Sequence, residues 1–259
     1  MHNTRLGVLA IMKNEAMNIT EWLDHYVWLG CDSIFLIDNG STDDTIARVE
    51  AHPFRDRIEL VARSEPHNQV GHYREVYATL DIGSQVDWLI MADLDEFWFV
   101  KDGSSLKALL DKQMQAVDLI YTNWTVFGSS GHDEHPESLR RDLLSCRPNL
   151  AAHENTKWIA RTAALNADWM YTHKVRDLDS RRIISNNVEL QLNHYITQSR
   201  EYWRTVKMVR GDASKAENDG VRTWDYFDRN DAACTAQDTR LSSLVGEAQG
   251  ASLSLRASA

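Results

Sequence analysis

The sequence predicts an α/β fold in which a mostly parallel sheet is flanked by helices and followed by a helical C-terminal part. Strand-like and helix-like patterns alternate through the first hundred residues. The strand-like runs are short and continuously apolar, which is typical of strands buried on both faces of a parallel sheet. Alternation of this kind predicts parallel strands joined by helices that cover the sheet.

The first strand and helix are marked by an apolar run and by residues suited to helix ends. Residues 6–11 are continuously apolar, as expected of a buried strand. Asn18 is placed to cap the following helix, with Glu21 three residues on and apolar residues recurring along one face. Gly30 is placed to end that helix, because glycine readily adopts the left-handed conformation common there.

Three further strands and two helices complete the predicted parallel unit. The strands are expected at residues 33–37, 58–62 and 88–92. A short helix ends near residue 51, and an apolar stripe at helical spacing runs through residues 70–80.

The second half of the chain carries weaker patterns. They predict helices at residues 106–110 and 199–211, and strands at residues 119–127 and 190–196. We place one domain over residues 1–211 and a C-terminal extension over residues 212–259. The final residues include few large apolar side chains, so we expect them to be weakly ordered. Removal of the chain after about Thr235 is then expected to leave stability nearly unchanged.

Composition excludes several classes of protein. The chain has 28 Lys and Arg against 38 Asp and Glu, a formal net charge of −10, which disfavours binding to nucleic acid. It has no apolar run near the roughly 18 residues needed to span a bilayer, and no signal-peptide pattern. Peripheral membrane contact through a local basic cluster stays open. Three widely spaced cysteines suggest neither a disulfide framework nor a metal knuckle, so a cytoplasmic location is expected.

Polar side chains follow three of the four predicted strands. Ligands on parallel α/β sheets bind beyond the carboxyl ends of the strands, so we expect these side chains to line one crevice. They are Lys13, Asn14 and Glu15 after the first strand, Asp38 and Asn39 after the second, and Asp93 and Asp95 after the fourth.

Asp93 and Asp95 form the strongest chemical signal. Residues two apart in an extended chain point to the same side, so two carboxylates meet at a strand end. Close carboxylates repel each other unless a cation lies between them. Mg²⁺ and Mn²⁺ bind such oxygens together with substrate phosphates, and can stabilise a nucleotide diphosphate as a leaving group. The alternative, a solvated acidic turn, is disfavoured by the buried strand that precedes the pair.

The Asp38-Asn39 pair and His194 are each compatible with a role in a binding site or with a purely structural role. Asp38 and Asn39 offer groups that bind a nucleobase or a ribose hydroxyl, but the Asn-Gly-Ser-Thr-Asp sequence that begins at Asn39 also suits a turn and a helix cap. His194 ends an alternating stretch and is placed to complete the metal coordination of Asp93 and Asp95. Packing in the core is its alternative role.

Together these motifs resemble GT-A-type glycosyltransferases of the family 2-like and family 92-like branch. The resemblance covers roughly residues 5–211. It is carried by Lys13-Asn14-Glu15, Glu21-Trp22-Leu23, Gly30, the run from Asp38 to Asp43, the run from Asp93 to Phe97, the run from Phe127 to His132, the run from Leu192 to Ile196, and Ser199. The chain departs from many family 2 members in having Asp38-Asn39 where they carry two consecutive acids.

The resemblance implies a GT-A-like, Rossmann-like fold and a specific chemistry. The implied reaction is inverting transfer of a hexose from a nucleotide-diphosphate sugar, with a UDP-sugar expected, to a hydroxyl of a surface glycan or lipid-linked acceptor. The implied cofactor is Mn²⁺ or Mg²⁺. The resemblance assigns the metal to Asp93 and Asp95, with His194 as a further ligand. It assigns the nucleotide sugar to Lys13, Asn14, Glu15, Asp38, Asn39 and Asp93.

An inverting transfer needs a general base that deprotonates the acceptor hydroxyl. Asp133 and Glu134, in a polar loop, are candidates, although both suit an ordinary exposed loop. Lys157, Arg161 and the basic segment near Lys207 are candidates for neutralising phosphate charge, against the alternative of a solvated basic surface.

Two other functions fit parts of the pattern. A metal-dependent nucleotidyltransferase also holds a nucleotide over carboxylates, but the turn after the first strand has no glycine to form a phosphate loop. A non-catalytic nucleotide- or carbohydrate-binding protein is the second alternative. The intact pair of Asp93 and Asp95 argues against it, since such a protein has no need of a metal pair.

Overall fold

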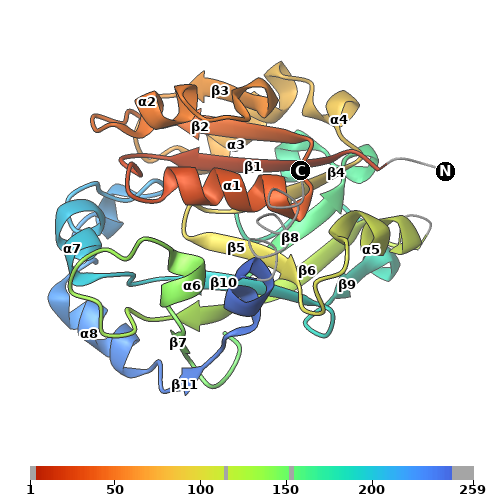
Figure 1. Cartoon of the computed structure of the whole chain (residues 1–259). Helices are drawn as coiled ribbons and strands as arrows, with labels where there is room; N and C mark the ends of the chain where they lie inside the picture. Colours follow the sequence, from red (N-terminus) through yellow and green to blue (C-terminus); the bar gives the residue numbers. More distant parts are fainter. Residues whose placement is uncertain (1–3, 114–115, 152–154, 247–259) are drawn as a thin grey trace, which may run out of the picture.

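The computed structural model describes residues 4–113, 116–151 and 155–246 (Figure 1). Its strands are β1 (Leu6–Met12), β2 (Ser33–Asp38), β3 (Ile58–Ala62), β4 (Trp88–Met91), β5 (Glu96–Val100), β6 (Leu119–Phe127), β7 (Ser145–Cys146), β8 (Thr156–Arg161), β9 (Ile183–Ser185), β10 (Leu190–Tyr195) and β11 (Ala236–Gln237). Its α-helices are α1 (Ile19–Leu29), α2 (Thr45–Glu50), α3 (Gln69–Thr79), α4 (Ile82–Gln85), α5 (Leu106–Gln113), α6 (Leu139–Asp142), α7 (Arg200–Tyr202) and α8 (Trp224–Ala232).

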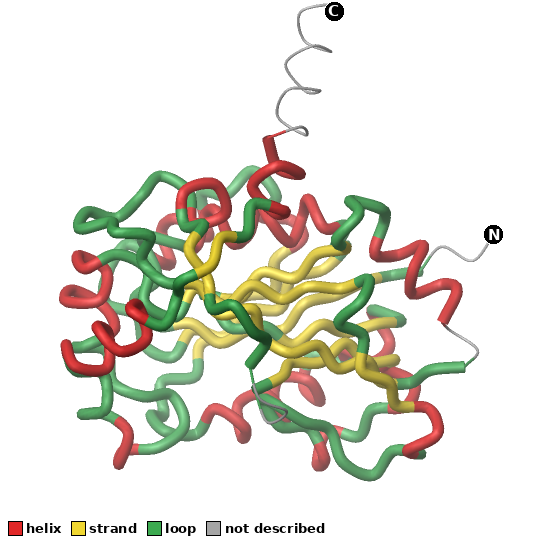
Figure 2. Tube along the Cα trace, turned by 90° about the horizontal axis from the view of Figure 1, so that it is seen from below, coloured by secondary structure: helices red, strands yellow, loops and turns green. Residues whose placement is uncertain are grey.

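One sheet runs through the molecule, which confirms the predicted α/β fold. Its strands lie in the order β11-β7-β6-β8-β4-β1-β2-β3, and β5, β9 and β10 pair beside this path. Seen from below, the strands cross the middle of the molecule and helices and loops surround them (Figure 2).

The predicted parallel unit is the part of the sheet formed by β4, β1, β2 and β3, and each adjacent pair among these four strands is parallel. Side chains alternate across this sheet because successive residues of a strand point to opposite faces. Val8 and Ala10 of β1 share a core cluster with α1, whereas Leu9 and Ile11 share another with α3. Helices therefore cover both faces, as the continuous apolar runs predicted.

The ends of α1 agree only in part with the sequence. Gly30 has a φ of 102° and ends the helix, as predicted. Asn18 precedes the first helical residue, but its side chain forms no capping hydrogen bond. Instead, the Asn18 amide donates to the Glu15 carboxylate at 2.9 Å, so it supports the turn that follows β1.

The second half of the chain adds strands of both directions, so the whole sheet is mixed. β8 runs antiparallel to β4 and to β6. β10 lies between β5, its antiparallel partner, and β6, its parallel partner. This register places His194 opposite Glu96. The backbone N–H of Tyr195 also donates to the Asp95 carbonyl at 2.9 Å, so β10 is tied to the loop that follows β4.

The C-terminal segment packs on the domain as far as residue 246, contrary to the expectation that residues after Thr235 are dispensable. β11 pairs with β7, and Leu241 and Val245 are buried in the same core cluster as α1. The two buried side chains offset part of the entropy that ordering costs. The rest of the predicted weakly ordered end, residues 247–259, lies outside the described residues.

The helical C-terminal part is confirmed at α7 and α8, which lie together at one end of the molecule (Figure 1). Across residues 4–113, 116–151 and 155–246, no helix is long and apolar enough to cross a membrane.

Candidate functional site

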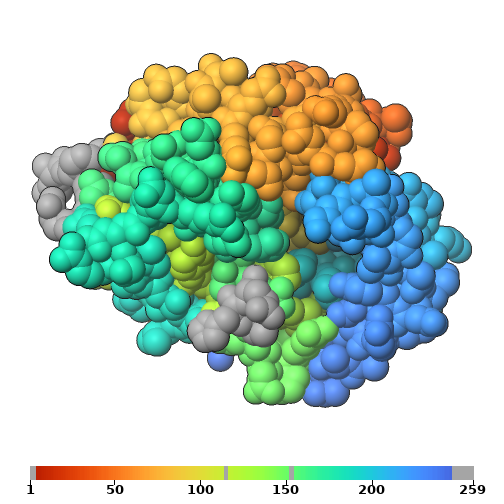
Figure 3. Space-filling view, turned by 180° about the vertical axis from the view of Figure 1, so that it is seen from behind, coloured from red at the N-terminus to blue at the C-terminus, as the bar shows by residue number. Residues whose placement is uncertain are grey.

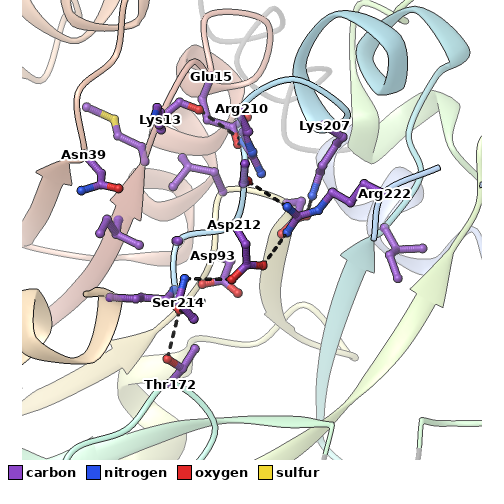
Figure 4. Close-up of a pocket in the computed structure, with 18 of the residues that line it drawn as sticks. Lys13, Glu15, Asn39, Asp93, Thr172, Lys207, Arg210, Asp212, Ser214 and Arg222 are labelled. Atoms are coloured by element: carbon purple, nitrogen blue, oxygen red, sulfur yellow. Dashed lines mark hydrogen bonds and ion pairs between the residues drawn. The ribbon is translucent and has the colours of Figure 1, made fainter. Parts of the chain in front are cut away.

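A pocket of about 390 Å³ lies beyond the carboxyl ends of β1, β2 and β4. Lys13 and Glu15 reach it from the turn after β1, Asn39 from the end of β2, and Asp93 and Asp95 from the loop after β4. The end of β10 and the segment after α7 close the remaining sides. Figure 4 shows Lys13, Asn39 and Asp93 from the first half of the chain together with Lys207 and Arg222 from the second. We call this cavity the first pocket.

The structure brings six of the predicted site residues to the first pocket and leaves four outside its lining. Those in the lining are Lys13, Glu15, Asn39, Asp93, Asp95 and His194; those outside are Asn14, Asp38, Asp133 and Glu134. The residues within the lining come from the three predicted strand ends and from β10.

Asn14 and Asp38 shape the turns beneath the first pocket. Asn14 has a φ of 54°, and its side-chain oxygen accepts a hydrogen bond from the Thr42 backbone N–H at 2.8 Å. The Asp38 carboxylate accepts from the backbone N–H of Gly40 at 3.3 Å and of Ser41 at 3.1 Å. These are the turn contacts that the Asn-Gly-Ser sequence also suits.

Asp93 is paired with a buried lysine. The Lys157 ammonium donates to Asp93 Oδ2 at 2.7 Å and lies 3.6 Å from Glu96 Oε2. Burial raises the pKa of Asp93, but Lys157 outweighs it and holds that pKa below its usual range. Burial raises the pKa of Glu96 well above its usual range, so Glu96 favours its neutral form. Of the two carboxyl groups beside Lys157, Asp93 is therefore the ionised one.

Asp95 is paired with a second lysine and with His194. The Lys207 ammonium donates to Asp95 Oδ2, and His194 Nε2 lies 3.6 Å from the same oxygen. Burial raises the pKa of Asp95, but Lys207 and then His194 outweigh it and hold the pKa well below its usual range. Lys207 itself is only 6% exposed. Two ionised carboxylates thus stand two residues apart at the edge of the first pocket.

The donor atoms of this site suit a divalent cation whose ligands come partly from the protein and partly from a substrate. Asp93 Oδ1 and His194 Nδ1 are buried and have no hydrogen-bond partner among the described residues. No group of three or more His, Cys, Asp or Glu in that part of the chain is arranged to enclose a metal. Mg²⁺ and Mn²⁺ commonly take one or two carboxylates and complete their shell with phosphate oxygens and water. The residues present fit that kind of site.

The segment after α7 supplies two further cations, Arg210 from the basic segment that the sequence indicated and Arg222, which it did not. Arg210 pairs with Glu15, which also accepts a hydrogen bond from the Tyr202 hydroxyl at 2.7 Å. Arg222 pairs with Asp212 at 3.2 Å. Figure 4 shows this pair beside Asp93. Basic residues near Lys207 were a signal for the first part of the segment, but Arg222 lies in irregular chain with no periodicity to reveal it.

The predicted general bases stand on an exposed loop. The side chain of Asp133 is 86% exposed, and its nearest ion-pair partner is Arg200 at 3.7 Å. Glu134 is exposed as well. Neither residue reaches the first pocket.

Comparison with known proteins gives one family and several relatives. The sequence model of glycosyltransferase family 92 matches residues 9–231. A family 92 protein of Arabidopsis thaliana is 25% identical over 139 residues, which are 50% of this chain and 22% of that protein. One from Ricinus communis is 22% identical over 254 residues, 90% of this chain and 45% of that protein. The chain thus spans less than half the length of these relatives.

Solved structures with a similar chain path are more distant. S. aureus TarS, residues 1–349, is 14% identical with a TM-score of 0.47, over 83% of this chain and 68% of that one. Glucosyl-3-phosphoglycerate synthase from Mycobacterium tuberculosis, solved with Mn²⁺, UDP and glucosyl-3-phosphoglycerate, is 15% identical with a TM-score of 0.36. That match covers 62% of this chain and 58% of the synthase.

Proposed function

We propose that this chain, which belongs to glycosyltransferase family 92, transfers a hexose from a nucleotide-diphosphate sugar to a hydroxyl acceptor with inversion at the anomeric carbon. The donor class that we propose is a UDP-sugar, and the acceptor is a hydroxyl of a glycan or lipid-linked glycan. The first pocket is the donor site of this proposal.

One observation carries the proposal. Two ionised carboxylates, Asp93 and Asp95, stand at the edge of the first pocket, each beside a buried lysine. Lys13, Lys207, Arg210 and Arg222 line the same pocket in a chain whose net charge is −10. Cations gathered in this way suit a diphosphate, because charge-assisted hydrogen bonds to phosphate are short and strong.

The carboxylates have a defined part in the proposal. Asp93 and Asp95, with His194 beside them, are the residues that would hold Mn²⁺ or Mg²⁺. When bound, the ion supplies a Lewis acid that neutralises charge on the leaving diphosphate. We assign the nucleotide to Lys13, Glu15 and Asn39, which line the pocket. Asn14 and Asp38, which the resemblance assigns to the nucleotide sugar as well, lie outside the lining, and we propose for them the role of shaping the turns beneath the pocket.

The cations after α7 act on the leaving group. As the acceptor oxygen attacks the anomeric carbon, the bond from that carbon to the diphosphate breaks and its electron pair passes to the diphosphate. Arg210 and Arg222 are held in place by Glu15 and Asp212 respectively, so they present fixed positive charge to that group. Preorganised charge of this kind stabilises a transition state without reorganisation.

A panel of nucleotide sugars tests the function. The protein is incubated with UDP-, GDP- and ADP-hexoses in the presence of Mn²⁺, and the products are measured by chromatography. We expect one donor class, the UDP-hexoses, to release nucleoside diphosphate. Release of pyrophosphate in reactions with nucleoside triphosphates and sugar phosphates would indicate a nucleotidyltransferase instead. Absence of turnover together with nucleotide binding would indicate a non-catalytic binding protein.

A further inference from the structure

A second cavity of about 530 Å³ adjoins the first pocket. Tyr171 and Lys174 line it, and Thr172 and His173 line both cavities, so the two meet at these residues. Seen from behind, the segment around residues 165–185 faces the segment around residues 205–220 across a hollow (Figure 3). We call the second cavity the side pocket.

Three cations surround Tyr171, which lines the side pocket, and of the three Lys174 is the one that also lines it. Arg74, Arg176 and Lys174 lie 4.6, 4.9 and 5.7 Å from the centre of its ring. Hydrogen bonding to Arg74, with the charges of Arg176 and Lys174, holds the pKa of the Tyr171 hydroxyl below its usual range. The surroundings of Tyr171 are therefore positively charged.

These cations have no acidic partner in the described part of the chain. None of the three forms an ion pair there, although the sequence contains 38 acidic residues. Arg74 donates to the Met170 carbonyl at 3.1 Å, while its Nη2 is buried with no hydrogen-bond partner among the described residues. A buried, unsatisfied guanidinium nitrogen is costly, but Arg74 is outside the lining of the side pocket. The exposed ammonium of Lys174, which does line the pocket, is the cation that an anion bound there can reach.

His173 stands where the two cavities meet, in a form suited to take a proton. Its Nδ1 lies 2.9 Å from the Thr156 carbonyl oxygen, so Nδ1 carries the hydrogen and Nε2 carries the lone pair. Nε2 forms no hydrogen bond with any described residue. Burial lowers the pKa of His173, which keeps the ring neutral at physiological pH. The ring is also held edge-on to Trp124, with the ring centres 5.3 Å apart.

We infer that the side pocket binds the acceptor, that this acceptor carries a phosphate or carboxylate group held by Lys174 with the neighbouring charge of Arg176, and that His173 removes its proton. The inference rests on the proposed function, because it places the acceptor beside the proposed donor site. The acceptor O–H bond breaks and its proton passes to Nε2 of His173. The oxygen bonds to the anomeric carbon, the bond to the diphosphate breaks, and the proton later leaves to water.

The anionic selectivity is tested with matched acceptors. Each hexose is offered with its 6-phosphate and its uronic acid, together with the donor that the protein turns over, and transfer is measured as product formed. We expect at least one charged member to have a KM about tenfold below that of its neutral counterpart, as one charge-assisted contact provides. The two charged arms distinguish phosphate from carboxylate.

Substitutions then localise the effect. Lys174→Gln with Arg176→Gln should raise the KM for the charged acceptor about tenfold or more and leave the KM for the neutral hexose and for the donor unchanged. Arg181→Gln is the matched control, since Arg181 is exposed and paired with Asp179, and it should change neither value. Equal use of charged and neutral acceptors by the wild type, or an unchanged KM in the double variant, would overturn the inference.

The proton transfer has its own test. His173→Asn keeps a donor for the Thr156 carbonyl but lacks the basic nitrogen, so kcat should fall by about 10²- to 10⁴-fold with little change in the KM for the acceptor. The acid limb of the wild-type kcat profile should disappear in the variant. His132→Asn, on the exposed loop, is the control. A kcat within about threefold of wild type in His173→Asn would remove His173 from the mechanism.

Failure of the proposed function is seen separately. Nucleoside diphosphate release without any acceptor reports donor turnover alone. If no donor is turned over, the proposed function fails, and calorimetric titration with the charged and neutral hexoses still decides the acceptor site. Tighter binding of a charged hexose, lost in the Lys174→Gln and Arg176→Gln variant, supports the site; equal binding overturns it.

Discussion

Replacing Lys157 with methionine should lower the free energy of unfolding by more than the loss of an exposed ion pair does. The Lys157 side chain is 0% exposed, and its ammonium lies 2.7 Å from Asp93 and 3.6 Å from Glu96. Lys157→Met removes that charge and leaves the Asp93 carboxylate without its cation. Breaking a buried pair in this way costs about 3–5 kcal/mol. In a protein of this size that corresponds to a fall of roughly 10 °C in Tm.

The chain offers a matched control. Lys107 and Asp32 are also 2.7 Å apart, but their side chains are 25% and 44% exposed. Lys107→Met should therefore cost about 1 kcal/mol or less. The double variant Lys157→Met, Asp93→Asn should recover about 1–3 kcal/mol of the loss, because it removes the uncompensated charge as well. Urea unfolding followed by circular dichroism measures all four proteins. Equal losses in Lys157→Met and Lys107→Met would refute the reasoning.

Three further predictions follow from burial. Truncation after Thr235 should lower the free energy of unfolding measured in urea, and Leu241→Ala alone should lower it by about 2–5 kcal/mol. An unchanged urea midpoint would show that the segment contributes nothing to stability. Asp133→Asn with Glu134→Gln should leave kcat within about twofold, since both side chains are exposed outside the first pocket, and a loss of a hundredfold or more in a transfer assay would return the base to this loop. Burial raises the pKa of Cys234 to about 11, so its reaction with a thiol reagent should accelerate about tenfold per pH unit between pH 7 and 10 in the folded protein; a plateau near pH 9 would contradict that pKa.

The parallel half of the sheet was predictable because its signals are local. Continuous apolar runs identify β1, β2, β3 and β4, and the strand ends then identify Asp93 and Asp95. Buried strands of this kind must be apolar on both faces, so the pattern of residues reflects the architecture directly. The antiparallel pairing of β8 was not predictable, since strand direction depends on where a distant segment returns to the sheet.

The partners of the two carboxylates depend on such distant contacts. Lys157 meets Asp93 across 64 positions of sequence, and Lys207 meets Asp95 across 112. The sequence offered both lysines only as basic residues, candidates for phosphate binding against the alternative of a solvated surface. Only the fold shows that each is buried against a carboxylate. The sequence assigned no role to His173 for the same reason, since the role that we propose for it depends on the Thr156 carbonyl and on the meeting of two cavities.

The structure supports the placement of His194 near Asp95 better than the sequence pattern did. Residues 190–196 alternate weakly, so strand β10 was expected, but its place between β5 and β6 was not. That place brings the imidazole to 3.6 Å from Asp95. Its role as a metal ligand stays a prediction.

Calorimetric titration of UDP into the protein tests the central claim, that Asp93 and Asp95 hold the donor diphosphate through a divalent cation. The titration is run with Mn²⁺ and with EDTA on the wild type, on Asp93→Asn, on Asp95→Asn and on Asp179→Asn, an exposed carboxylate, as control. The wild type and Asp179→Asn should bind UDP at least tenfold more tightly with Mn²⁺, a difference of about 1.4 kcal/mol. Both pocket variants should lose that increment while remaining folded. UDP binding that is indifferent to Mn²⁺ in the wild type, or an increment that survives in both pocket variants, would contradict the account.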